Sequence, residues 1–276
     1  MKVWIDGRVV DENEAVVSAF DHGLTVGDGV FETLKVEGGL PFALTRHLAR
    51  LQRSARGLGL PVPDAEEVRH AVAEALGANS EHLHQPMRLR ITLTGGPAPL
   101  GSERGPGRRT LVVALATLAG WAPSAKVVLV PWVRNERSAV AGLKTTSYAD
   151  NVVALSHARE RGASEALFGN TRGELCEGTG SNVFVVVDGA VLTPPLSSGC
   201  LAGVTRELLL EWTEAQERDL PLAVLDQADE VFLASSTRDV QPVHAVGERD
   251  LPGVEGDLTR RVAETFAVRA AEQVDP

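Results

Sequence analysis

The chain has 276 residues, 43% of them apolar, and a formal net charge of −10 at pH 7. This length can bury a full core and is enough for two modest domains, whereas the acidic balance disfavours a nucleic-acid-binding surface, which needs a basic stripe. No stretch approaches the roughly 20 apolar residues that span a bilayer, and no signal peptide is apparent, so we expect a cytoplasmic protein without a membrane partner. Cys176 and Cys200 are too few and too unpatterned for a disulfide framework or a zinc site, and we expect no metal.

Patterns in the first half predict two hairpin strands, two helices and two further strands. Asp6-Gly7 favours the type I′ turn of a hairpin, and Asp64 with Glu67 is typical of a capping box at a helix start. Apolar residues at helical spacing support both helices. The expected elements are strands Lys2–Ile5 and Arg8–Val10, helices 44–58 and 64–76, and strands Met87–Thr94 and Thr110–Leu115.

A long loop between the last two of these strands is rich in glycine, proline and arginine. It runs from Gly95 to Arg109, and loops of this length are more often functional than plain connections. A domain boundary is expected soon afterwards. We therefore expect a smaller N-terminal α/β domain at 1–119, a linker at 120–124, and a larger C-terminal domain at 125–276 that carries Lys144.

The second half repeats the hairpin signal at Asp188-Gly189, between two apolar strands. A helix is expected just after Lys144, and an amphipathic helix near the end of the chain. The expected elements are strand Lys126–Val133, helix 150–159, strands Val183–Val187 and Ala190–Thr193, strand 230–234 and helix 258–273.

Lys144 and Glu177 are the two residues that suggest chemistry. Only four of the 27 basic residues are lysine, so a lysine flanked by Gly, Leu and Thr at the end of an element is notable. Its amine could form a Schiff base with an aldehyde cofactor and then serve as a base. Glu177, in a small-residue turn before a strand, could pair with a protonated pyridine nitrogen. Together they point to pyridoxal phosphate, although each alone has an ordinary structural explanation.

Three further segments could bind the cofactor's phosphate. Gly203-Val204-Thr205 begins a helix, where free backbone N–H groups and a hydroxyl would face an anion. Ser236, in a Ser/Thr turn after a strand, and Arg50 could contribute as well. Taken alone, each segment also has an ordinary explanation. Gly203–Thr205 could be a simple capped helix start, Ser236 could lie in a common turn, and Arg50 could belong to a solvated basic face of its helix.

The chain resembles a known family over essentially its whole length. The residues that carry the resemblance are Asp21–Glu32, Arg46–Leu51, Lys144 with Tyr148, Glu177–Asn182 and Gly203–Thr205. In order and spacing they are similar to the fold type IV pyridoxal-phosphate enzymes, the class IV aminotransferases and their relatives. The resemblance implies a two-domain α/β (α+β) fold like that of D-amino-acid aminotransferases, and a homodimer.

By this resemblance, Lys144 is the catalytic lysine and Glu177 is the partner of the pyridine nitrogen. Tyr148 would donate to the cofactor's ring oxygen. The residues implied to bind the phosphate are Arg50, Gly203, Val204, Thr205 and Ser236.

Three branches of the family share these residues and differ around the substrate. D-amino-acid aminotransferases carry a Tyr where this chain has Phe31, and an Arg-x-His pair in the loop that is 95–109 here. Branched-chain aminotransferases tend to have a Tyr-x-Arg-Pro-like strand where this chain has Met87–Ile91, although they share Tyr148. Neither pattern is present.

By exclusion, the chain looks most like 4-amino-4-deoxychorismate lyases, which release pyruvate and 4-aminobenzoate. We expect this activity first, with an aminotransferase acting on branched-chain amino acids, D-amino acids or amines as the alternative. A non-catalytic protein that retains the fold is a remote third. The substrate of the lyase carries carboxylates, so we expect arginines that can bind them with two parallel hydrogen bonds. The residues expected around a small amino substrate are Phe31, Arg104, Arg108 and Thr237.

Overall fold

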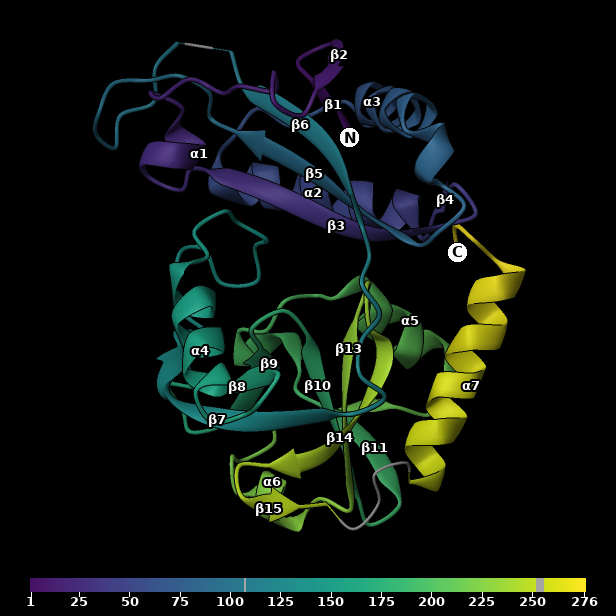
Figure 1. Ribbon diagram of the computed structural model, residues 1–276. Coiled ribbons are helices and arrows are strands. Elements are labelled where there is room, and N and C mark those ends of the chain that lie inside the picture. The colour runs from purple at the N-terminus through teal and green to yellow at the C-terminus, as the bar shows by residue number, and fades with distance from the viewer. Residues whose placement is uncertain (107, 252–255) are drawn as a thin grey trace. The chain divides into compact units, whose positions relative to one another are not determined.

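The computed structural model describes residues 1–106, 108–251 and 256–276, and the chain forms two compact units (Figure 1). The first unit comprises Met1–Ala119, Leu143–Tyr148 and Val274–Pro276, and the second comprises Gly120–Gly142 and Ala149–Gln273. The segment that carries Lys144 thus belongs to the first unit, although the sequence placed it in the C-terminal domain. Its backbone hydrogen bonds to a strand of the first unit explain the difference.

The first unit is a six-stranded antiparallel sheet with two long helices packed against one face (Figure 1). Its strands, in the sheet order β2-β1-β6-β5-β3-β4, are β1 (Lys2–Ile5), β2 (Arg8–Asp11), β3 (Gly29–Glu37), β4 (Leu40–Pro41), β5 (Met87–Thr94) and β6 (Thr110–Thr117). Its helices are α1 (His22–Thr25), α2 (Leu44–Leu58) and α3 (Ala65–Ala78), followed by a 3-10 turn at Ser80–His82.

Alternation along the strands decides which side chains enter the core of the first unit. In β5, Leu89, Ile91 and Leu93 are fully buried and pack with apolar residues of α2 and α3. The residues between them, including Arg90, point to the other face of the sheet. This other face lies away from α2 and α3 and presents polar and charged side chains of β5.

The predicted hairpins and most strands of both halves are confirmed. Asp6 and Gly7, like Asp188 and Gly189, have positive φ angles, as a type I′ turn requires. The predicted capping box is only half right. Asp64 accepts a hydrogen bond from the amide of Glu66 at 3.0 Å, whereas the Glu67 carboxylate pairs with Arg109 instead of reaching back.

The second unit is built on a nine-stranded mixed sheet. Eight strands follow the order β12-β11-β10-β13-β14-β7-β8-β9, and β15 pairs with β14. The strands are β7 (Ala125–Arg134), β8 (Glu165–Asn170), β9 (Leu175–Gly178), β10 (Asn182–Val187), β11 (Ala190–Thr193), β12 (Gln216–Glu217), β13 (Glu230–Ser235), β14 (Asp239–Val246) and β15 (Arg249–Asp250).

The helices of the second unit cover parts of this sheet. They are α4 (Ala149–Arg159), α5 (Val204–Trp212), α6 (Val224–Gln227) and α7 (Asp257–Glu272), with a 3-10 turn at Leu196–Ser198. Alanines and valines of α4, β7 and β8 form one buried cluster around Phe168. Among the described residues, no helix combines the length and the apolar character that crossing a membrane requires.

Candidate active site

Lys144 lies on a short extended segment that pairs with the start of β3. The amide of Phe31 donates to the carbonyl of Lys144 at 3.0 Å, and the amide of Thr146 donates to the carbonyl of Gly29 at 2.8 Å. The amide of Lys144 also donates to the Ser54 hydroxyl of α2 at 3.1 Å. The backbone on both sides of the lysine is therefore fixed within the first unit.

Three functional groups surround the buried ring of Phe31. The Nζ atom of Lys144 lies 4.4 Å from the ring centroid, and the guanidinium carbon of Arg90 lies 3.7 Å from it. The ring of Tyr148 meets it edge-on, with centroids 5.3 Å apart and an interplanar angle of 80°. The structure thus brings Phe31, Lys144 and Tyr148 together, as the sequence analysis expected of site residues, and adds Arg90 to them.

Arg50 belongs to a fully buried ionic cluster that the sequence did not reveal. Its Nε and Nη2 atoms donate to the two carboxylate oxygens of Glu32 at 2.8 and 2.7 Å, and Nδ1 of His47 lies 2.6 Å from the same carboxylate. Burial would raise the pKa of Glu32, but Arg50 and His47 outweigh it and set the pKa well below its ordinary value. The bidentate contact fixes the plane of the Arg50 guanidinium.

Glu177 of β9 is held at both carboxylate oxygens within the second unit. Oε1 accepts from Nε of Arg134 at 3.2 Å, and Oε2 accepts from the backbone amide of Leu201 at 2.9 Å. The guanidinium of Arg134 stacks 4.1 Å above the ring of Phe168. A cationic and a backbone donor therefore both favour the ionised carboxylate, the form that a protonated pyridine nitrogen would need.

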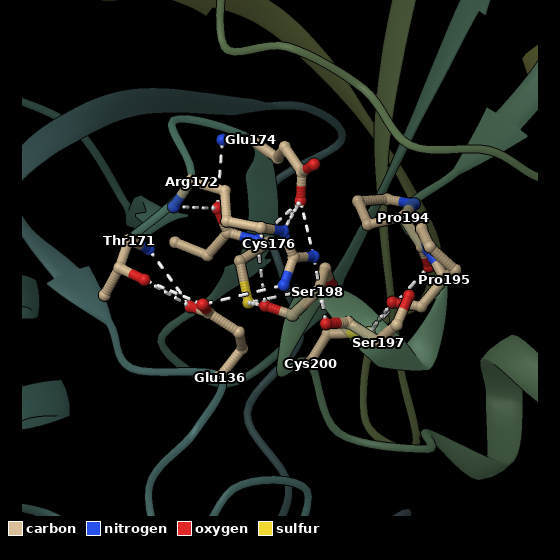
Figure 2. Close-up of polar contacts among 11 residues, drawn as sticks. Glu136, Thr171, Arg172, Glu174, Cys176, Pro194, Pro195, Ser197, Ser198 and Cys200 are labelled. Carbon is tan, nitrogen blue, oxygen red and sulfur yellow. Dashed lines mark hydrogen bonds and ion pairs between the residues drawn. The ribbon is translucent and has the colours of Figure 1, made fainter.

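A polar network positions the chain that leads to Leu201 (Figure 2). The Sγ atom of Cys176, the residue before Glu177, donates to the carbonyl of Ser198 at 3.3 Å, and Nη2 of Arg172 donates to the carbonyl of Ser197 at 3.0 Å. Cys200, the residue before Leu201, donates to the carbonyl of Pro195 at 3.5 Å. Both thiols thus hold the backbone next to the Glu177–Leu201 contact, one before Glu177 and the other before Leu201.

The predicted anion-binding helix start is α5, which follows Gly203. No side chain caps this helix, and Thr205 in its first turn is 2% exposed. Within the described chain the Thr205 hydroxyl makes no hydrogen bond, so the helix start retains donors for an anion. A Cβ atom at Gly203 would lie only 2.0 Å from the side-chain oxygen of Asn182, which makes glycine necessary there.

Ser236 and Thr237 lie in the turn between β13 and β14. The neighbouring Arg238 donates to the buried carboxylate of Glu165 at 3.0 Å, and its guanidinium stacks 3.8 Å above the ring of Trp121. Glu165 also accepts from the amide of Thr179, two residues after Glu177. One buried ion pair therefore fixes both the turn with Ser236 and the turn that follows Glu177.

The loop arginines that we expected to bind substrate differ in their contacts within the chain. The guanidinium of Arg104 donates to both carboxylate oxygens of Asp28, at 2.7 and 2.6 Å, and to the carbonyls of Leu58 and Gly59 at the end of α2. These contacts tie the loop to the first unit. Arg108 is exposed and makes no side-chain contact within the part of the chain that the structure describes.

Comparisons with known proteins agree with the geometry. The family model "Amino-transferase class IV" matches residues 29–246, which is most of the chain. The chain belongs to the class IV aminotransferases.

Two curated members of this family match nearly the whole chain. A putative branched-chain-amino-acid aminotransferase of Methanocaldococcus jannaschii is 32% identical over 96% of this chain and 95% of its own length. A bifunctional aminodeoxychorismate lyase and D-amino acid transaminase of Mycobacterium tuberculosis is 32% identical over 97% and 96% of the two chains.

Solved structures of class IV aminotransferases share the fold. A branched-chain aminotransferase of Thermoproteus uzoniensis with norvaline has a TM-score of 0.90 and 32% identity, covering 97% of this chain and 93% of the other. A PLP-bound aminotransferase of Mycobacterium tuberculosis has a TM-score of 0.88 and 27% identity, covering 99% and 100%. This class IV aminotransferase is therefore a PLP-dependent enzyme of fold type IV.

The chain's own donors fit pyridoxal phosphate. The unmet hydroxyl of Thr205 and the uncapped start of α5 suit the phosphate, and the doubly held Glu177 suits the ring nitrogen.

Glu32, Arg90 and Arg134 were missed by the sequence analysis. A glutamate within an apolar strand was the available signal for Glu32, since a buried carboxylate needs a cationic partner. Arg90 alternates with buried leucine and isoleucine in β5, but only three-dimensional structure shows what lies beside it.

Proposed function

We propose that this enzyme is an aminotransferase that moves the amino group of an α-amino acid, either branched-chain or of D configuration, to a 2-oxo acid. The observation that supports it is the position of the Lys144 amine beside Phe31 and Tyr148, in a chain whose relatives are mainly aminotransferases. The sequence analysis favoured the lyase, and the aminotransferase alternative now has the better support.

Each residue of the candidate active site has a proposed task. Bound pyridoxal phosphate supplies an aldehyde that condenses with amines and a ring that absorbs negative charge from the substrate's α-carbon. Lys144 would take the proton from that carbon, because its amine can act as a base and lies 4.4 Å from the centroid of the Phe31 ring. Glu177, kept ionised by Arg134, would pair with the ring nitrogen. Tyr148 would donate to the ring oxygen.

The phosphate would be bound by residues of the first and the second half of the sequence. The proposed donors are the Arg50 guanidinium, the Thr205 hydroxyl, the Ser236 hydroxyl and the backbone amides of Val204 and Thr205 at the start of α5. The amide of Gly203 itself donates to the carbonyl of Leu201, so Gly203 would contribute by letting the backbone approach the phosphate. A phosphate at a helix start is stabilised by the N–H groups that the first turn leaves unpaired. Phe31 and Thr237 are proposed to contact the substrate.

Aminodeoxychorismate lyase is the second candidate function. It is supported by the Mycobacterium tuberculosis relative, whose name gives both activities. The two reactions share the removal of the α-proton by a lysine and differ afterwards, so one chain can support both.

The test is a comparison of amino donors with matched lysine variants. Purified protein is incubated with pyridoxal phosphate, and the visible absorbance of the bound cofactor is recorded. The D and L forms of alanine and leucine are then added with 2-oxoglutarate as acceptor, and the D and L forms of glutamate with pyruvate as acceptor. We expect Lys144→Ala to lose both the lysine-dependent absorbance and keto-acid formation, whereas Lys126→Ala, which alters a half-buried lysine of β7 that pairs with Glu248, retains both.

A cofactor-loaded wild-type protein that forms no keto acid would refute the aminotransferase. Its release of pyruvate and 4-aminobenzoate from 4-amino-4-deoxychorismate would then establish the lyase. Failure of the wild type to bind the cofactor at all would contradict both candidates.

We further propose that the enzyme is a homodimer that works in the cytoplasm. Each unit exposes several large apolar side chains that are close in sequence, and burial of these side chains against a second copy would stabilise a dimer. In the first unit they surround α1, where the amide of Ala98 donates to the carbonyl of Phe20 and joins the two segments. The exposed apolar residues are Val16, Val17, Phe20, Leu24, Val26 and Leu100 in the first unit, and Leu129, Trp132, Val133, Val152 and Val153 in the second.

A second copy of this chain is the proposed partner for these surfaces. Sedimentation of the wild type should give the mass of a dimer, and Leu24→Glu, which alters a side chain that is 66% exposed, should shift the equilibrium toward the monomer. A wild-type protein that sediments as a monomer at micromolar concentration would overturn this proposal.

A further inference from the structure

Helix α2 meets the segment that carries Lys144 along one side. Arg50, Ser54 and Gly57 follow each other at intervals of four and three residues, the spacing that places side chains on the same face of a helix. Arg50 is 4% exposed and Ser54 is 1% exposed. Four residues advance a helix by about 6 Å, so these positions form a row along the helix axis.

Ser54 holds the backbone of the lysine. Its hydroxyl accepts from the amide of Lys144 at 3.1 Å, and within the described residues this hydroxyl makes no other hydrogen bond. The carbonyl of Lys144 accepts from the amide of Phe31 at 3.0 Å. The two backbone polar groups of Lys144 are therefore bound from opposite sides, one by α2 and the other by β3.

Gly57 makes room for the residue before the lysine. A Cβ atom at Gly57 would lie 2.7 and 2.9 Å from the two methyl carbons of Leu143. These distances are shorter than an ordinary contact between carbon atoms, so any larger residue at position 57 must displace Leu143. The helix surface at Gly57 therefore determines how closely the Lys144 segment approaches α2.

His47 indicates that the lysine amine, as well as its backbone, lies near this side of α2. His47 is fully buried and precedes Arg50 by three residues. Burial lowers the pKa of His47, and the positive charges of Arg50 and Lys144 lower it further, whereas Glu32 opposes them. The effect of a charge weakens with distance, so the Lys144 amine must be close to the helix.

We propose that α2 sets the separation between the cofactor's phosphate and the Lys144 amine, with Ser54 and Gly57 as the residues that position the lysine. Arg50 is the proposed phosphate donor on this helix, and Glu32 fixes the plane of its guanidinium. One regular helix would thus hold both ends of the same bound molecule at a fixed spacing. The inference rests on the proposed function, in which Lys144 and the phosphate site serve one cofactor.

The experiment compares two forms of the cofactor. The aldehyde of pyridoxal phosphate condenses with the lysine amine and releases one water, whereas pyridoxamine phosphate has an amine in place of the aldehyde and binds without this bond. Dissociation constants of both are measured for the wild type, Ser54→Ala, Ser54→Thr and Gly57→Ala. Hydrogen exchange of a peptide that spans residues 143–148 reports on the Lys144 amide in the same proteins.

We expect Ser54→Ala to raise the dissociation constant of pyridoxal phosphate about 3- to 10-fold, the effect of one lost hydrogen bond, and to change that of pyridoxamine phosphate less than about twofold. The reason is that the phosphate donors stay in place while the lysine does not. Ser54→Thr keeps a hydroxyl and should recover most of the affinity. The 143–148 peptide should exchange faster in Ser54→Ala than in Ser54→Thr.

Gly57→Ala tests the same inference without removing a hydrogen bond. Alanine favours a helix over glycine, so this change displaces Leu143 without weakening α2 itself. It should raise the dissociation constant of pyridoxal phosphate by a similar factor and leave that of pyridoxamine phosphate unchanged. The matched control is Gly77→Ala in α3, whose Cβ atom would meet nothing within 4 Å and which should bind both forms as the wild type does.

A Lys144→Ala background tests whether Ser54 acts through the lysine. This variant keeps the amide at position 144 and lacks the amine, so pyridoxal phosphate cannot form a bond there. Adding Ser54→Ala should then change neither dissociation constant, because the two changes are coupled through one contact.

Equal weakening of both cofactor forms would overturn the inference, and so would an effect of Ser54→Ala that persists without the lysine amine, since a merely structural role predicts both. Unchanged constants in a folded Ser54→Ala variant would overturn it too, while leaving the proposed aminotransferase intact. If Ser54→Ala and Gly57→Ala both fail to fold, this side of α2 serves the fold and the inference is wrong. A wild-type protein that gains no lysine-dependent absorbance would instead contradict the proposed function.

Discussion

The buried Glu32–Arg50 pair gives a quantitative prediction about the first unit. Glu32→Gln removes the negative charge and leaves the guanidinium of Arg50, which is 4% exposed, without its carboxylate. The change replaces two ionic hydrogen bonds of 2.8 and 2.7 Å and disturbs a third, from His47 at 2.6 Å. Removing one member of a buried ion pair costs about 3–5 kcal/mol, and we expect this loss in the free energy of unfolding.

The same cluster predicts a loss of stability in acid. The folded pKa of Glu32 lies below its unfolded value, so its contribution is fully present above the unfolded value and is lost as pH falls through the folded one. Burial also lowers the pKa of His47, so on acidification the unfolded chain gains a proton that the folded chain resists. His47 therefore makes the wild type less stable from about pH 6.5 downward, and Glu32 adds to the loss below about pH 4.5.

Urea denaturation, with hydrogen exchange measured in peptides from β3 and α2, would give these free energies locally. The control is Glu37→Gln, on the same strand, whose carboxylate is 61% exposed and lies 3.5 Å from Lys35. It should change stability by no more than about 0.5 kcal/mol. A loss below about 1 kcal/mol for Glu32→Gln would refute the reasoning, since Arg50 would then tolerate burial without its partner.

Three smaller predictions follow from other contacts. Asp275→Ala removes the acceptor for the first-turn amide of α2, a helix without a side-chain cap of its own, and should cost about 1 kcal/mol in urea denaturation. Gly203→Ala places a Cβ atom against Asn182 and should cost about 1–3 kcal/mol and weaken cofactor retention on dialysis. Burial raises the pKa of Cys176 and Cys200, so both thiols should react with a disulfide reagent only after unfolding.

Matched variants test these three. Asp226→Ala removes an exposed carboxylate from the first turn of α6 that accepts no hydrogen bond among the described residues, and a cost equal to that of Asp275→Ala would contradict the capping argument. Gly180→Ala meets no atom within 4 Å, so it should retain cofactor where Gly203→Ala loses it. Rapid labelling of a thiol in the native protein would contradict the burial of the cysteines.

Local patterns predicted the parts of the fold that depend on local energetics. Alternation of apolar residues placed β5 at Met87–Thr94, its observed bounds, and the Asp-Gly turns placed both hairpins. Helix α3 continues two residues past its expected end at 76, through Gly77 to Ala78, because one glycine near a helix end costs only about 1 kcal/mol. These features depend on neighbours within a few residues.

Features that depend on distant partners could not be predicted. The membership of Lys144 in the first unit rests on hydrogen bonds to Phe31 and Gly29, more than 100 positions earlier. The sequence analysis took Arg104 for a substrate contact because a Gly/Pro-rich loop gives no sign of what its arginines meet. Arg90 went unnoticed for the opposite reason, since its strand looks like ordinary alternation.

The division of the chain between its two units has a consequence for biosynthesis. The first unit includes Leu143–Tyr148 and Val274–Pro276, while the residues between these segments belong to the second unit. A nascent chain of 119 residues therefore lacks the strand-like segment beside β3 and the carboxylate of Asp275 at the start of α2. The part of the protein that is made first therefore gains its last native contacts only when almost the whole chain has left the ribosome.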